Sequence, residues 1–169
     1  MIARTDRVGL VSGHWRRWKT VAAMEVANRL HQTIDGLSVY IGVMPAELLK
    51  EHPESHPEIT MHGGVRTASN EYHLVVAVFD AGSGARITDA TVIATVFGPG
   101  NTVIYGQRHS RLLPAVPQKT LEPMTIGQML TYGGFFVLPK PATYTFQLTI
   151  TRPGRTKPTV TSLVYDHRG

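Results

Sequence analysis

The chain has 169 residues, of which 42% are apolar and 17% are charged, and it contains no cysteine. This composition indicates one globular domain, or one domain with a short appendage, and excludes disorder throughout. The lack of cysteine excludes zinc ribbons, iron–sulfur clusters and thiol nucleophiles. No run of residues approaches the roughly 20 apolar positions needed to cross a bilayer, so we expect no membrane span in the chain as given.

The net charge of +5 is concentrated at the start of the chain. Residues 1–32 carry six basic and two acidic groups and both tryptophans, whereas the rest is nearly balanced. A balanced body with scattered charges is not typical of nucleic-acid binding, so we expect no nucleic-acid partner. Three interpretations of residues 1–32 remain open: a degraded export signal, an amphipathic helix that covers part of the body, and a misassigned start codon, which we favour.

From residue 33 onward, short segments of period two alternate with Gly- and Pro-rich segments, which predicts strands and turns. The predicted turns include Gly98-Pro-Gly-Asn101 and the segment from Pro114 to Pro117. We therefore expect an N-terminal extension over 1–32 and one β-domain over 33–169. One short helical turn is predicted over Met44–Lys50. The predicted strands are Leu37–Val43, Glu71–Phe79, Ala90–Phe97, Thr102–Tyr105, Leu121–Ile126, Phe135–Leu138, Tyr144–Thr151 and Thr159–Asp166.

The segment 141–150 indicates which all-β architecture these strands form. Tyr144, Phe146, Leu148 and Ile150 fall on one face, and polar residues fall on the other. A tyrosine that opens such a strand after a proline-containing corner resembles the tyrosine corner of immunoglobulin-like domains. We expect an immunoglobulin-like antiparallel β-sandwich of about seven to nine strands.

Eight histidines and six methionines are the most unusual feature of this composition. Imidazole and thioether together form a soft ligand set that suits copper. His73 lies within an otherwise apolar strand, where a buried imidazole needs a hydrogen-bond partner or a metal. His62 stands beside Met61, just before Gly63 and Gly64, and Met124 follows a proline that could expose it at a sheet edge. Each position also has an ordinary structural explanation, as a turn histidine, a hydrogen-bonded core histidine or a core-filling methionine.

Enzyme motifs are missing from the sequence. It contains no G-x-S-x-G, no phosphate-binding glycine loop and no H-E-x-x-H. We therefore expect no enzymatic activity and no catalytic residues.

The stretch Glu122-Pro-Met-Thr-Ile-Gly-Gln-Met-Leu-Thr-Tyr-Gly133, followed by Phe136-Val-Leu-Pro139 and Tyr144-Thr-Phe-Gln-Leu148, resembles a family of periplasmic iron-transport-associated proteins. These are copper- and iron-binding immunoglobulin-like domains found beside bacterial high-affinity iron permeases. The resemblance extends back through Met61-His62-Gly-Gly64 and Glu71-Tyr-His-Leu-Val75, so it covers roughly residues 35–166.

The resemblance implies a metal site. Met124 matches the ligand methionine of the family, and His73 matches its ligand histidine on an early strand. The family has a ligand histidine just before the Tyr-Gly pair, whereas this chain has Thr131. Either His62 or another histidine substitutes for it, or the site is lost and the fold alone remains.

The leading hypothesis is a periplasmic metal-binding protein that assists copper or iron handling, with His73, Met124 and His62 as ligands. Copper is the expected metal, with iron as the alternative. A membrane iron permease or another periplasmic protein would be the partner, and the family implies a homodimer. The competing hypothesis is a metal-free accessory sandwich domain that pairs with another protein through an exposed edge strand.

Overall fold

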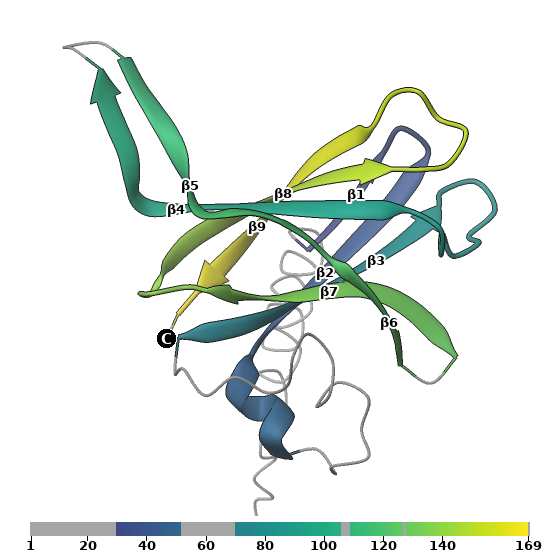
Figure 1. Ribbon diagram of the computed structural model, residues 1–169, viewed down its shortest axis with the longest axis horizontal. Helices are drawn as coiled ribbons and strands as arrows, with labels where there is room; N and C mark the ends of the chain where they lie inside the picture. Colours follow the sequence, from purple (N-terminus) through teal and green to yellow (C-terminus); the bar gives the residue numbers. More distant parts are fainter. Residues whose placement is uncertain (1–29, 52–69, 106–108, 127, 169) are drawn as a thin grey trace, which may run out of the picture.

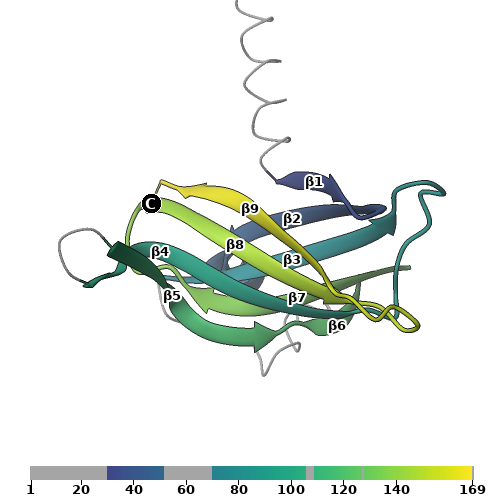
Figure 2. The same ribbon diagram turned by 90° about the horizontal axis from the view of Figure 1, so that it is seen from above.

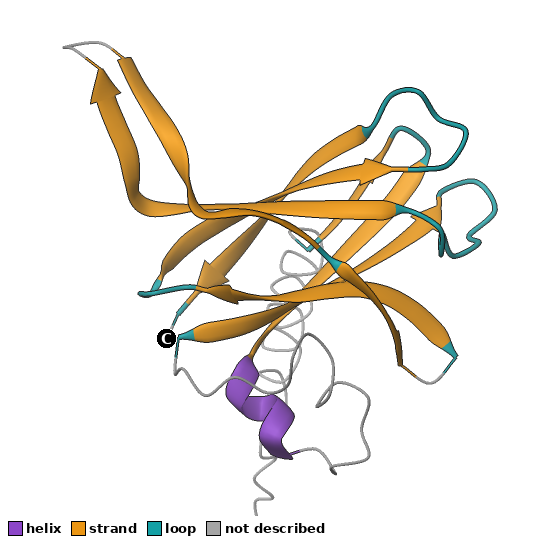
Figure 3. Cartoon of the chain, viewed as in Figure 1, coloured by secondary structure: helices purple, strands orange, loops and turns teal. Residues whose placement is uncertain are grey.

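The computed structural model describes residues 30–51, 70–105, 109–126 and 128–168, which form nine strands and one short 3-10 helix (Figures 1 and 3). The N-terminal extension expected over 1–32 lies mostly outside these residues. The elements are β1 (His31–Ile34), β2 (Leu37–Pro45), η1 (Ala46–Glu51), β3 (Glu71–Asp80), β4 (Thr91–Tyr105), β5 (His109–Thr120), β6 (Glu122–Ile126), β7 (Met129–Val137), β8 (Ala142–Thr151) and β9 (Thr159–His167).

The strands form two antiparallel sheets that face each other (Figure 2). One sheet has five strands in the order β1-β2-β3-β7-β6, and the other has four in the order β5-β4-β8-β9. This arrangement confirms the all-β sandwich that the period-two segments predicted. Strand β3 is the central strand of the larger sheet, as its apolar residues on both faces require.

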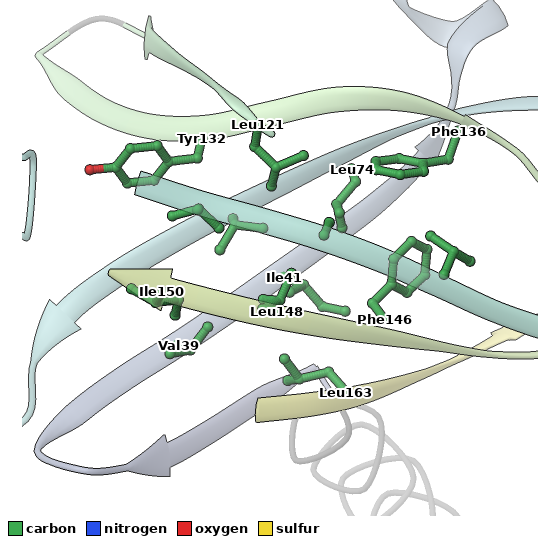
Figure 4. Packing of buried hydrophobic residues seen from close by; sticks show 14 of the residues in the cluster. Val39, Ile41, Leu74, Leu121, Tyr132, Phe136, Phe146, Leu148, Ile150 and Leu163 are labelled. Carbon is green, nitrogen blue, oxygen red and sulfur yellow. The ribbon is translucent and has the colours of Figure 1, made fainter. Parts of the chain in front are cut away.

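The space between the sheets is filled by the side chains that point inward from alternate positions of the strands (Figure 4). In β8, every second residue from Tyr144 to Ile150 is buried, as predicted from its alternation. In β3 the inward series is Tyr72, Leu74, Val76 and Val78. The opposite face of β3 therefore carries His73 and Val75, so His73 lies outside the sandwich core.

The tyrosine corner expected at the start of β8 is present. The Tyr144 hydroxyl donates a hydrogen bond to the Lys140 carbonyl oxygen at 2.9 Å, and the ring is 1% exposed. Gly98 of β4 makes room for this ring, because a Cβ atom at position 98 would lie 2.3 Å from Tyr144 Cε1. The corner and the glycine thus form one packing unit that joins β4 to the start of β8.

Two parts of the smaller sheet differ from the sequence prediction. Gly98-Pro-Gly-Asn101 was expected to be a turn, but β4 continues through it with register shifts between Phe97 and Thr102. The prolines at 114 and 117 were expected to lie in a turn, but they belong to β5. An edge strand tolerates proline because one side of its backbone needs no ladder hydrogen bonds. Because β4 and β5 continue through these segments, the hairpin that they form extends from the body as a long arm (Figure 1).

Strand β1 was not predicted. It pairs with β2 through a two-residue turn at Asp35 and Gly36, whose φ angles are 49° and 74°. Two positive φ angles are typical of the type I′ turn, and Asp-Gly is a favoured sequence for it. The helical turn expected over Met44–Lys50 begins two residues later, since Met44 and Pro45 still belong to β2. Within the described part of the chain, no helix has the length and apolar character of a membrane span.

Candidate metal centre

His73 is the third residue of β3 and lies on the outer face of the five-stranded sheet. The residue is 0% exposed, and both ring nitrogens are buried. Its ring lies 4.9 Å from the ring of Phe135, its register partner on β7, measured between centroids. A sheet face turned away from the core would normally be wet, so this burial requires a cover.

Helix η1 contributes to that cover. Ala46 and Leu49 of η1 are fully buried and form a small apolar cluster with Phe135 and the partly buried Met44. The chain passes directly from β2 into η1, and η1 contacts β3. The short helix therefore folds back over the end of the sheet at which His73 lies.

Met44 is the register partner of His73 on the other side, on β2. Side chains directly opposite each other on antiparallel strands have Cβ atoms about 4.5–5.5 Å apart. A thioether sulfur and an imidazole are thus held next to each other. Sequence reasoning missed Met44 because it placed this residue in the helical turn, and only the pairing of β2 with β3 could reveal the contact.

Glu71 adds a carboxylate to the same face. It lies two residues before His73 on β3, about 7 Å along the strand, and is 5% exposed. Imidazole nitrogen, thioether sulfur and carboxylate oxygen are three donor types that metal ions accept. Across the described residues, no group of three or more His, Asp or Glu side chains is arranged to hold an ion.

The inward neighbour of His73 fixes this end of β3 to the opposite sheet. The Tyr72 hydroxyl and His167 Nε2 on β9 form a buried hydrogen bond of 3.3 Å. Burial is the main cause that raises the pKa of Tyr72, with smaller contributions from Glu47 and Tyr144. Tyr72 is therefore neutral at physiological pH and acts as a structural tie between the sheets.

Met124 lies elsewhere on the outer face. It is 2% exposed on β6, opposite Thr131 of β7, whose hydroxyl donates a hydrogen bond of 3.4 Å to the Met124 carbonyl oxygen. Since His73 pairs with Phe135, Met124 is displaced by the four residues between Phe135 and Thr131, roughly 13 Å along the strand. Two strand spacings add roughly 10 Å across the sheet. One chain does not bring His73 and Met124 to a single ion.

The third expected ligand, His62, lies outside the described residues. The position expected to differ from the family, Thr131, faces Met124 directly, so a hydroxyl occupies the place where the family resemblance implies an imidazole. The described residues therefore offer a His–Met pair at His73 and Met44, and a Thr–Met pair at Thr131 and Met124.

No family model and no curated protein matches this chain. The solved structures that share its fold include two of FetP and one of a DUF4426 family protein. FetP of uropathogenic Escherichia coli strain F11 has a TM-score of 0.56 and 15% identity, covering 82% of this chain and 93% of FetP. A copper-bound variant of FetP has a TM-score of 0.55 and 15% identity, covering 82% and 94%.

The third structure is a DUF4426 family protein from Pseudomonas aeruginosa PAO1. Its TM-score is 0.54 at 11% identity, and the match covers 82% of this chain and 96% of that protein. At these identities the likeness shows the fold. It agrees with the architecture expected from the resemblance to periplasmic iron-transport-associated proteins, to which FetP corresponds in fold and bound metal.

Proposed function

We propose that this protein binds copper and acts as a metal carrier in the periplasm. The observation that carries the proposal is the buried His73 with Met44 directly opposite it, beneath η1. The fold shared with FetP supports it, since one FetP structure is copper-bound and FetP was expressed in the periplasm. Copper is preferred over iron because a thioether is a soft ligand.

The donor set favours a carrier over a catalyst. A His nitrogen and a Met sulfur bind Cu(I) without demanding a rigid geometry, and Glu71 supplies an oxygen that Cu(II) accepts. The sequence holds no G-x-S-x-G motif, no phosphate-binding glycine loop and no H-E-x-x-H motif. We therefore propose that the protein has no enzymatic activity and passes its metal to a membrane iron permease or another periplasmic protein.

His62 remains a proposed ligand. It lies in the chain segment that connects η1, which contributes to the cover over His73, to β3, which carries His73. Met124 remains a proposed ligand only for a second ion or for an ion shared between two copies in a homodimer, because of its offset from His73.

An anaerobic Cu(I) competition titration on the full chain tests the proposal. We expect one ion per chain and binding at least tenfold weaker in His73→Ala, with weaker binding at pH 5.5 because protons compete for imidazole. His62→Ala tests the connecting segment in the same way. His31→Ala is the matched control, since His31 lies on β1 and stacks on Tyr40 at 4.1 Å, away from Met44. Unchanged affinity in His73→Ala, or no binding by the wild type, would overturn the proposal.

The competing function is a metal-free accessory domain that pairs through an edge strand. The offset between His73 and Met124 favours it, because that offset removes one of the two expected ligands from the site. Strand β9 is an edge of the smaller sheet and exposes Val160 and Val164, which are 46% and 37% exposed. Absence of copper binding together with capture of a partner through β9 would support this function.

A further inference from the structure

A second polar site lies at one end of the sandwich, in a hollow of about 250 Å³. The loop between β8 and β9 forms one wall, and Asp35 from the β1–β2 turn forms another. Figure 1 shows this loop and this turn at the same end of the molecule. Met44 lies at the opposite end of β2 and η1 follows that end, so the hollow is separate from the candidate metal centre.

Three cations converge on this hollow. Arg152, Arg155 and Lys157 all line it, and they fall within six residues of sequence. Among the described residues, none of the three forms an ion pair with a carboxylate, and Asp35 is the single acidic residue in the lining. Three like charges held close together repel one another, which destabilises the loop. A bound anion would offset this repulsion.

The loop presents these cations on a restrained backbone. Pro153 and Pro158 fix two of its seven φ angles, and Gly154 adopts a φ of 73° that other residues rarely adopt. The Arg155 amide donates a hydrogen bond to the Arg152 carbonyl oxygen at 3.1 Å, which closes the turn. Less freedom is therefore lost when a ligand binds.

Arg152 also has an electrostatic role outside the hollow. Hydrogen bonds from Ser83 and Gly82, with a smaller contribution from the Arg152 charge, lower the pKa of Asp80. Asp80 thus partly balances Arg152, and Asp35 is the one acidic residue in the lining of the hollow. The lining keeps an excess of positive charge.

We propose that this hollow binds a small anion that carries two or more carboxylate or phosphate charges. Arg155 and Lys157 would bind separate oxygens, and the hydroxyls of Thr156 and Thr159 would donate hydrogen bonds. The volume lies just below the range of about 300–1,000 Å³ for drug-sized ligands, so it suits a compact ligand. This inference does not depend on copper binding.

Isothermal titration of the full chain with citrate and with inorganic phosphate tests the proposal, with sodium chloride holding the ionic strength constant. We expect saturable binding of at least one probe, and Arg155→Ala and Lys157→Ala should each weaken it about tenfold. Lys140→Ala is the matched control, because Lys140 precedes β8 and lies at the other end of that strand. Asp35→Asn should tighten binding, since it removes the opposing charge while Asn tolerates the positive φ of this position.

Vesicles of phosphatidylglycerol, tested in parallel by co-sedimentation, distinguish a free anion from a lipid headgroup. Binding to vesicles alone would overturn the proposal. So would an equal loss in Lys140→Ala, which would assign the effect to net charge, or the absence of saturable binding by either probe. Thermal melting of each variant without ligand should match the wild type, so that weaker binding reports on the hollow rather than on folding.

Discussion

Met44 and His73 occupy directly opposed positions on β2 and β3, on the sheet face turned away from the core. The pair is covered by the helix that follows Met44 without an intervening loop. A thioether and an imidazole are thus held together by backbone pairing instead of by a mobile loop. The metal proposal therefore depends on the register of two strands.

The contribution of Met44 can be separated from that of Met124. Met44→Leu should weaken Cu(I) binding about tenfold, because it removes the sulfur with little change in volume. Met124→Leu should leave the affinity unchanged, since its strand position lies far from His73. The same competition titration measures both. The reverse result would move the site to β6 and contradict the role of Met44.

Restoring an imidazole opposite Met124 should create a second site. In Thr131→His, the new side chain would face Met124 directly across β6 and β7. We expect the Cu(I) stoichiometry to rise from one to two ions per chain, measured by titration with metal analysis. Thr131→Ser is the control, since it keeps a hydroxyl and should leave the stoichiometry at one. A stoichiometry of one in Thr131→His would show that an imidazole at 131 and Met124 do not suffice.

The packing of Gly98 against Tyr144 predicts a large effect from one methyl group. Gly98→Ala should destabilise the fold by about 1–3 kcal/mol, because the added Cβ would overlap the Tyr144 ring. Gly42→Ala is the control, since no atom lies within 4 Å of a Cβ built in β2 at that position. Urea denaturation measures both. Equal stability of the two variants would mean that the Tyr144 ring can move aside.

The lowered pKa of Asp80 predicts that the fold loses stability in acid. Hydrogen bonds from Ser83 lower the pKa of its carboxyl in the folded protein, so its stabilising contribution is present above the unfolded pKa. That contribution disappears as the pH falls through the folded pKa. Asp80→Asn should therefore lower the melting temperature at pH 7 and make little difference near pH 2.

Ser83→Ala provides a second test of the same interaction. It removes the hydroxyl that donates to Asp80 Oδ1 at 2.9 Å but leaves the Ser83 amide hydrogen bond in place. Its effect at pH 7 should be smaller than that of Asp80→Asn and should also vanish in acid. An effect of either variant that is constant from pH 2 to pH 7 would contradict this origin.

Much of the fold could be predicted from alternation alone. Side chains point alternately to the two faces of a strand, so the apolar positions of β8 identify its buried face. Apolar residues on both faces of β3 identify it as a central strand. Strand β1 was missed although Asp35-Gly36 is a hairpin signal, because the four residues before it are too few to show a period. The prolines of β5 misled the prediction because their tolerance depends on an edge position that only sheet order reveals.

The candidate site was less predictable than the fold. The place of His73 on an outer face could be predicted from the alternation of β3. Its neighbours could not, because cross-strand contacts depend on register, and a shift of two residues would replace Met44 with another partner. The preceding proline and the family resemblance suggested Met124, yet pairing through β7 places that residue far from His73 on the same face of the sheet.

The pairing of β3 with β7 also limits the rate at which the protein can fold. Val76 and Tyr132 are register partners although two strands of the other sheet lie between them in sequence. Large loops must close before such contacts give any stabilisation, and sandwiches of this kind fold in milliseconds to seconds. The central strand thus remains without its β7 neighbour until late in synthesis.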